Sequence, residues 1–163
     1  MQSIHPFLWF DDNAEEAVEF YASIFKNSKI TSVNRYPENA PGPAGKVMTM
    51  SFELGGQKFT ALNGGPVYKF TPAISFVVSC ENQEEIDEYW TRLTEGGEEV
   101  QCGWLVDKYG VSWQIVPDDI GKFFSSSDPA TSQRVMEAML PMKKLDIAAL
   151  HRAYEGPVSA SPA

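Results

Sequence analysis

Residues 13–21 read Asn-Ala-Glu-Glu-Ala-Val-Glu-Phe-Tyr, and residues 82–90 read Asn-Gln-Glu-Glu-Ile-Asp-Glu-Tyr-Trp. Each block follows a short apolar run, which ends at Phe10 in the first case and at Val78 in the second. A chain that repeats itself in this way is typically built from like modules that share a core. The repeat therefore predicts two related modules, and a paired fold of this kind favours a ligand site where the modules meet.

The first module is expected over residues 1–65. Its apolar start, residues 4–10, has the composition of a strand buried on both faces. A helix is predicted over residues 13–25, because apolar side chains recur there at spacings of three and four. Three further strands are predicted at 30–36, 47–54 and 57–62, the last two joined by a Gly55-Gly56 hairpin turn.

The pattern restarts in the second module, residues 66–120. The predicted elements are a strand at 73–80, a helix at 82–95, and short strands near Val100, at 104–107 and at 111–116. Aligning Gly110 with Gly56 places Gln114 on Thr60. The repeat thus covers the whole β-α-β-β-β module, and each module has the same order of elements.

A non-repeated tail follows Pro117 and is expected to be helical over residues 121–156. Asp128 and Pro129 predict a helix start, Pro141 predicts its end, and a second helix is expected over 145–154. Residues 157–163 are predicted to be disordered. The fold class is therefore α+β, with two modules pairing into curved mixed sheets around a cavity and a helical C-terminal tail.

Composition excludes several classes of protein. The chain has 163 residues and a formal net charge of −9, which argues against nucleic acid and anionic membrane partners. It begins without the basic and long apolar regions of a signal peptide, and no apolar run is long enough to span a membrane. Cys80 and Cys102 form neither a metal-ligand spacing nor a disulfide framework. We expect a soluble cytoplasmic protein with reduced thiols.

Two such modules in one short chain resemble the vicinal oxygen chelate superfamily, which includes glyoxalase I, bleomycin-resistance proteins and extradiol dioxygenases. The motifs that carry the resemblance are Ile4-His5-x-x-Leu8-x-Phe10-x-Asp12 and Asp107-Lys108-Tyr109-Gly110-x-x-x-Gln114. Residues 8–17, 55–57, 62–66, 107–114 and 144–148 are similar to the PhnB-like branch, often labelled 3-demethylubiquinone-9 3-methyltransferase.

The resemblance implies where a metal would be held in related enzymes, which use His or Gln on the first strand, Glu on the fourth, His on the fifth and Glu on the eighth. These positions fall on His5, on or near Thr60, on Ala73 or Ile74, and on Gln114. One imidazole and one amide without a carboxylate are a poor donor set for a divalent ion. We therefore expect no metal, and no other cofactor.

The candidate catalytic residues are His5 and Gln114, and each has a structural alternative, a backbone hydrogen bond for His5 and a structural amide for Gln114. The candidate cavity residues are Trp9, Thr60, Asn63, Cys102, Trp104, Ser112 and Gln114. Trp9 is favoured as a core residue, Cys102 as an inert thiol, and Asn63 could equally belong to a linker turn.

Two functions remain open. The first is binding of a small, partly apolar metabolite in the cup between the modules. The second is catalysis on a small oxygenated or aromatic substrate by a lyase, isomerase or methyltransferase, with His5 as acid or base and Gln114 as polariser. The methyltransferase label lacks support from residues, because no glycine-rich turn of the S-adenosylmethionine type follows a strand. A homodimer is expected from the resemblance.

Overall fold

The computed structural model describes residues 1–157 and divides the chain into two compact units, Met1–Phe70 and Thr71–Ala163. The boundary predicted from the sequence lies after residue 65. The first unit reaches farther because Tyr68 packs edge-on against Trp9, and Phe70 packs in the same way against Phe10. The disorder predicted for 157–163 falls, from residue 158 onward, outside the described residues.

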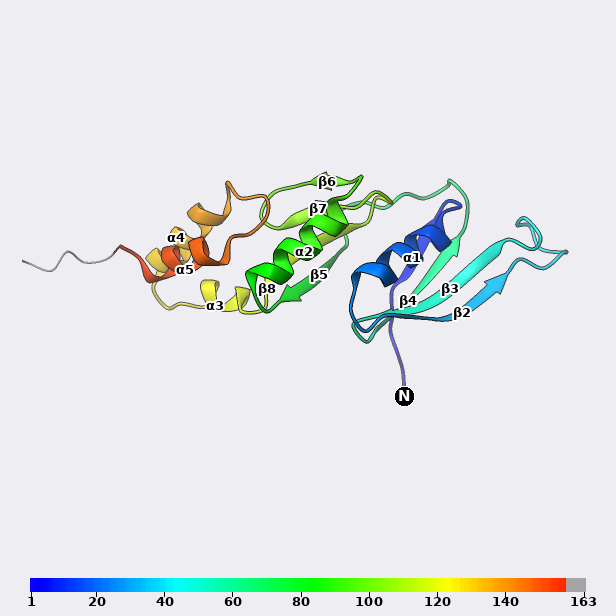
Figure 1. Ribbon diagram of the computed structural model, residues 1–163, viewed down its shortest axis with the longest axis horizontal. Coiled ribbons are helices and arrows are strands. Elements are labelled where there is room, and N and C mark those ends of the chain that lie inside the picture. Colours follow the sequence, from blue (N-terminus) through cyan, green and yellow to red (C-terminus); the bar gives the residue numbers. More distant parts are fainter. Residues whose placement is uncertain (158–163) are drawn as a thin grey trace, which may run out of the picture. The chain divides into compact units, whose positions relative to one another are not determined.

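The first unit is the predicted β-α-β-β-β module, with one helix lying across a four-stranded sheet (Figure 1). Its elements are β1 (Phe7–Phe10), α1 (Ala14–Ile24), β2 (Lys29–Arg35), β3 (Val47–Leu54) and β4 (Gln57–Asn63). The sheet order is β1-β4-β3-β2, and β1 runs parallel to β4 while the other neighbours are antiparallel. The predicted apolar stripe of α1 is its buried face, formed by Ala14, Ala17, Val18, Tyr21 and Ile24.

The second unit repeats this arrangement, and its last three strands are shorter than their counterparts in the first. Its elements are β5 (Ser75–Cys80), α2 (Gln83–Thr94), β6 (Glu98–Glu99), β7 (Trp104–Val106) and β8 (Ser112–Pro117). The order β5-β8-β7-β6, with β5 parallel to β8, reproduces that of the first sheet. Two mixed four-stranded sheets with helices confirm the predicted α+β class.

The tail folds as part of the second unit and consists of α3 (Ile120–Phe124), α4 (Pro129–Met139) and α5 (Ile147–Glu155). Its core is a buried cluster that also includes the end of β8, formed by Val116, Phe123, Val135, Leu145 and Leu150. The sequence predicted α4 and α5 but not α3, which is too short to show a helical period. Along residues 1–157, no helix is both long and apolar enough to cross a membrane.

The first strand begins at Phe7, not at residue 4 as predicted. Pro6 has no N–H group to donate to a neighbouring strand, so regular pairing starts after it. The Pro6 carbonyl nevertheless accepts the backbone N–H of Thr60 at 3.0 Å. The segment before β1 therefore stays beside β4, which brings His5 to Thr60.

Candidate functional site

In the first module, a hydrogen bond joins two of the candidate residues. His5 Nε2 lies 3.1 Å from Thr60 Oγ1. The imidazole is exposed and Thr60 is half-buried, so both groups can be reached by a small molecule. Beside them, Phe7 is the register partner of Thr60 and is 58% exposed.

In the second module, Gln114 makes the corresponding bond. Its side-chain Nε2 donates to Ser75 Oγ at 2.9 Å, and both residues are half-buried. Val77 is the register partner of Gln114 and is 57% exposed. Each polar pair thus has an exposed apolar side chain beside it.

The two pairs are equivalent in the repeat. Phe7 pairs with Thr60 in one sheet as Val77 pairs with Gln114 in the other, and His5 and Ser75 each stand two residues before the paired strand residue. The position related to His5 is therefore Ser75, not Ala73 or Ile74 as inferred from the sequence. Ile74 is 72% exposed and precedes β5.

The four equivalent positions thus carry one imidazole, two hydroxyls and one amide. A divalent ion is usually held by carboxylates or by several imidazole or thiolate groups, so these residues do not fit a metal. Within residues 1–157, no group of three His, Cys, Asp or Glu side chains is arranged to hold one either.

Two further candidates flank Gln114. Trp104 is its register partner on β7 and is half-buried. Ser112 lies two residues before Gln114 and pairs with Ser75. Its hydroxyl is buried and has no hydrogen-bond partner among the described residues. A buried polar group without a partner is unfavourable. The stability of the fold therefore gives no reason for a hydroxyl at this position of β8.

The remaining candidates lie elsewhere and have structural contacts. Trp9 Nε1 donates to the Gly65 carbonyl at 2.9 Å. The Asn63 amide accepts the Ala14 N–H at 2.8 Å and donates to the Val47 carbonyl at 3.1 Å. These residues fasten the end of β4 to the start of α1, away from the polar pairs.

Cys102 faces the tail. Its backbone has a positive φ of 59°, its N–H donates to the Met142 carbonyl, and its Sγ lies 3.6 Å from the Met139 carbonyl. The other thiol is inert at neutral pH, because burial, followed by the charges of Glu85 and Asp118, raises the pKa of Cys80 to about 12.

Sequence reasoning missed the role of Asp107. This carboxylate is 3% exposed and accepts the N–H groups of Tyr109 and Val111 and the indole N–H of Trp113, at 2.8, 3.1 and 2.8 Å. It therefore shapes the final hairpin and orients Trp113 into the core. The Asp-x-x-Gly spacing before a strand is the signal that could have indicated such a turn.

The family model described as 3-demethylubiquinone-9 3-methyltransferase matches residues 2–116. It covers both modules and ends before the tail, so the similarity noted at residues 144–148 lies outside it. No curated protein matches the chain.

Three solved structures are similar to this chain. A PhnB protein from Bacillus cereus with the same methyltransferase label is 42% identical, with a TM-score of 0.65 over 71% of this chain and 99% of that one. Protein PA1353 from Pseudomonas aeruginosa is 20% identical, with a TM-score of 0.60 over 72% and 98%. The fosfomycin resistance protein FosX from Listeria monocytogenes, complexed with Mn(II) and sulfate, is 18% identical, with a TM-score of 0.51 over 76% and 94%. The last two similarities concern the fold alone.

Proposed function

The chain belongs to the PhnB-like family described as 3-demethylubiquinone-9 3-methyltransferase, within the vicinal oxygen chelate superfamily, and on this premise we propose that it binds a small, partly apolar metabolite without a conventional divalent-metal centre. One observation carries the proposal. The same hydrogen-bonded polar pair occurs at the same register of the parallel strands in both modules, as His5–Thr60 and Ser75–Gln114.

The surroundings of the pairs indicate the chemistry of the ligand. A hydroxyl, an imidazole or an amide can exchange its present partner for a ligand hydroxyl or carbonyl at little cost, because one hydrogen bond replaces another. Phe7 and Val77 offer apolar surface beside these groups. A ligand with a few oxygen atoms on an apolar frame satisfies both features.

The family description suggests a methyl donor, but the residues do not fit one. The usual site for S-adenosylmethionine has a glycine-rich turn between a parallel strand and the following helix. Here the turn from β1 to α1 is Asp11-Asp12-Asn13, and that from β5 to α2 is Glu81-Asn82. We therefore assign no methyl-transfer step and expect no organic cofactor.

Catalysis on an oxygenated or aromatic substrate is the second candidate. The observation that favours it is the exposed imidazole of His5, held in place by Thr60, because a positioned imidazole can accept or return a proton. Gln114 would then polarise a substrate oxygen through its N–H groups. Unchanged turnover in a His5→Ala variant would remove His5 from the mechanism.

A thermal-shift screen of small oxygenated metabolites, combined with elemental analysis, tests the binding proposal. A ligand that binds the folded state raises the melting temperature. We expect this rise to be lost in Gln114→Ala and kept in Gln57→Ala, a matched change of an exposed amide on β4. Copurification of one divalent ion per chain would contradict the proposal, as would equal effects of the two variants.

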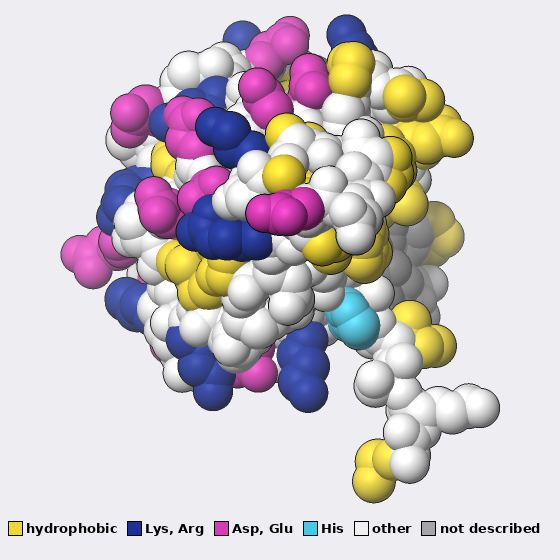
Figure 2. Space-filling view, turned by 90° about the vertical axis from the view of Figure 1, so that its right-hand side faces the viewer, with side chains coloured by type: hydrophobic (Ala, Val, Ile, Leu, Met, Phe, Trp, Pro, Cys, Tyr) yellow, Lys and Arg dark blue, Asp and Glu magenta, His cyan; other side chains and the backbone are white. Residues whose placement is uncertain are grey.

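The predictions about binding partners rest on the charge and exposure of surface residues. Figure 2 shows basic side chains interspersed with acidic ones on the face it presents, which supports the expectation that nucleic acid is not a partner. We also propose a homodimer, since all seven residues of the edge strand β2 are exposed, including Ile30 and Val33. Sedimentation of the chain as a monomer at micromolar concentration would contradict it.

A further inference from the structure

The second module contains a buried hydroxyl that the proposed function does not yet use. Ser112, at the start of β8, is 2% exposed, and its Oγ has no hydrogen-bond partner among the described residues. Burial without a partner is unfavourable for a hydroxyl. A change at the site that gives the Ser112 hydroxyl a partner is therefore favourable.

The repeated fold does not require a hydroxyl at this position. When Gly110 is aligned with Gly56, Ser112 corresponds to Lys58, which is exposed on β4. An alanine would fill the buried position without a polar group. The hydroxyl of Ser112 thus belongs to the second module and not to the architecture that the two modules share.

Another hydroxyl lies beside Ser112 on the same face of the sheet. Ser75 is its register partner across the parallel pair β5–β8, where strands lie about 4.8 Å apart. Ser75 Oγ accepts a hydrogen bond from Gln114 Nε2 at 2.9 Å, and Gln114 stands two residues farther along β8. Ser112 and Gln114 therefore flank one serine. A change of the Ser75 side-chain rotamer carries its hydroxyl from Gln114 toward Ser112.

The amide of Gln114 is the member of this group that a ligand can reach, since Gln114 is half-buried and Ser112 is covered. Its register partners are Val77, which is 57% exposed, and Trp104, which is half-buried. An N–H donor between two apolar side chains favours an acceptor oxygen on an apolar frame. None of these side chains carries a charge, and the net charge of −9 opposes an anion.

We infer that Ser112 is the positioning residue that frees Gln114 to bind the carbonyl oxygen of an uncharged, partly apolar ligand. When Gln114 Nε2 turns from Ser75 to the ligand, the Ser75 hydroxyl turns to Ser112 and the two hydroxyls form a hydrogen bond. Ser75 thus keeps a partner, and Ser112 gains the bond that it lacks in the free protein. This inference rests on the proposed function and names a ligand class for it.

An NMR titration of the isotope-labelled chain with acetophenone tests the ligand class. The side-chain amide signals of Gln114 are identified by their loss in Gln114→Ala. We expect acetophenone to shift these signals. Ethylbenzene, which lacks the oxygen, and benzoate, which is an anion, should bind at least several-fold more weakly. Equal or tighter binding of benzoate would overturn the assignment to an uncharged carbonyl.

Ser112→Ala tests the hydroxyl through two effects of opposite sign. Removing a buried hydroxyl without a partner should raise the melting temperature by roughly 1–4 °C. The same change should weaken acetophenone binding roughly twofold to tenfold, because Ser75 then loses its partner when the ligand binds. A lower melting temperature with unchanged affinity would show a role in packing alone. The control Ser127→Ala, at an exposed serine between α3 and α4, should change neither quantity.

Ser75→Ala shows whether Ser112 acts through Ser75. In this variant Gln114 has no bond to Ser75 to break, so acetophenone should bind at least as tightly as to the wild type. Adding Ser112→Ala should then change the affinity by less than about twofold, because the two hydroxyls no longer form a pair. An equal loss of affinity from Ser112→Ala in both backgrounds would overturn the inference.

The outcomes separate this inference from the proposed function. Binding of acetophenone that Ser112→Ala leaves unchanged overturns the inference and leaves the proposed function standing. The same holds if millimolar acetophenone causes no shift while another oxygenated metabolite raises the melting temperature of the wild type. Absence of both responses would contradict the inference and the proposed function together.

Discussion

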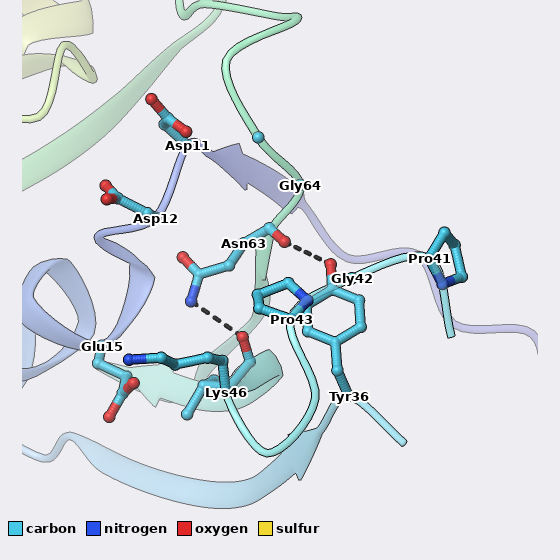
Figure 3. Close-up of a pocket in the computed structure, with 12 residues that line it drawn as sticks. Asp11, Asp12, Glu15, Tyr36, Pro41, Gly42, Pro43, Lys46, Asn63 and Gly64 are labelled. Carbon is cyan, nitrogen blue, oxygen red and sulfur yellow. Dashed lines mark hydrogen bonds between the residues drawn. The ribbon is translucent and has the colours of Figure 1, made fainter. Parts of the chain in front are cut away.

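The two modules share their order of strands but differ in what lies beside the start of the helix. The first module has an open cavity lined by the start of α1, the β2–β3 connection and the end of β4 (Figure 3), whereas in the second module Leu145 from the tail packs against the end of β8. The helices differ accordingly. Asn82 caps its own helix by accepting the Glu85 N–H at 2.9 Å, whereas Asn13 makes no such bond and α1 is capped by Asn63.

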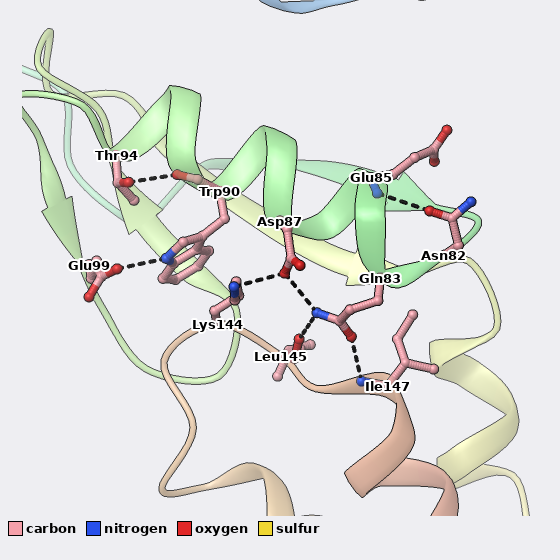
Figure 4. Close-up of polar contacts among 10 residues, drawn as sticks. All are labelled: Asn82, Gln83, Glu85, Asp87, Trp90, Thr94, Glu99, Lys144, Leu145 and Ile147. Carbon is pink, nitrogen blue, oxygen red and sulfur yellow. Dashed lines mark hydrogen bonds and ion pairs between the residues drawn. The ribbon is translucent and has the colours of Figure 1, made fainter.

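The difference shows which features the two modules share and which depend on the C-terminal tail. The order of strands and the parallel pairing are common to both modules. The sheet of the second module has a third strand of three residues, where the first has eight. A shorter strand covers less of the helix, and the tail contacts α2 there through Gln83 and Asp87 (Figure 4). The tail is therefore a structural part of the second module, as the following changes test.

Leu145→Ala should have the largest effect. Leu145 is 1% exposed and belongs to the cluster that joins β8 to the tail. Removing a buried Leu side chain costs about 2–5 kcal/mol because a cavity remains, which urea unfolding followed by fluorescence would measure. The control Leu140→Ala, at a residue that is 55% exposed, should change the free energy by less than about 0.5 kcal/mol. A small effect at Leu145 would mean that the packing of the tail contributes little to the stability of the second module.

Gly64→Ala tests whether the wall of the cavity in the first module is equally tightly built. An added Cβ would lie 2.4 Å from Trp9 Cε2, so the ring or the backbone must move, at a cost of about 1–3 kcal/mol. Gly121→Ala is the control, because no neighbouring side chain or backbone segment lies within 4 Å of the position that its Cβ would take. This change should be neutral or stabilise by up to about 1 kcal/mol. Equal melting temperatures for the two variants would mean that the Trp9 ring or the backbone moves aside at little cost.

Variants of three asparagines compare the two ways of capping a helix. Asn63→Ala removes bonds to the Ala14 N–H and the Val47 carbonyl and should cost about 1–3 kcal/mol, since buried groups lose their partners. Asn82→Ala removes one exposed cap and should cost about 1 kcal/mol. Asn13→Ala should cost less than either. Thermal unfolding of all three variants gives the order, and a larger cost at Asn13 than at Asn63 would refute the assignment.

Much of the fold follows from the sequence, because its signals are local. The helices at 14–24 and 83–94 are visible in apolar periodicity, and the hairpin alignment of Gly110 with Gly56 correctly related Gln114 to Thr60. The fifth-strand position related to His5 was misplaced by one or two residues, on Ala73 or Ile74 instead of Ser75. Composition does not reveal the register at which a strand begins to pair.

The position at which the tail packs could not be predicted from the sequence either, and the reason is different. Gln83 bonds Leu145 and Ile147, which are more than 60 residues away in the sequence, and no local pattern encodes such a contact. The cavity of the first module is also set by distant segments, since Tyr36, just after β2, donates a hydrogen bond to Asn63 at the end of β4. The sequence named Asn63 as a candidate cavity residue at the end of the fourth strand; it lines this cavity, and its amide makes structural hydrogen bonds.

The smallest effect is expected for the ion pair that fastens the tail. The hydrogen bond from Lys144, supported by that from Gln83, lowers the pKa of Asp87 below its usual range. A lowered pKa in the folded state means that the pair stabilises the protein above the pKa of the unfolded chain, about 4, and that this stability is lost as the pH falls through the folded pKa. Both side chains are more than 40% exposed, so the contribution is about 0.2–1 kcal/mol.

Asp87→Asn should therefore unfold at slightly lower urea than the wild type from pH 5 to pH 8, and the difference should shrink below about pH 4 as the wild-type carboxylate is protonated. High salt should shrink it as well, since the pair is accessible to screening ions. Glu88→Gln, at an exposed carboxylate one residue along α2, should show neither dependence. A difference that persists unchanged at pH 2 would mean that the Asp87 side chain acts through packing or its bond to Gln83, and that the charge of Lys144 does not help to hold the tail against α2.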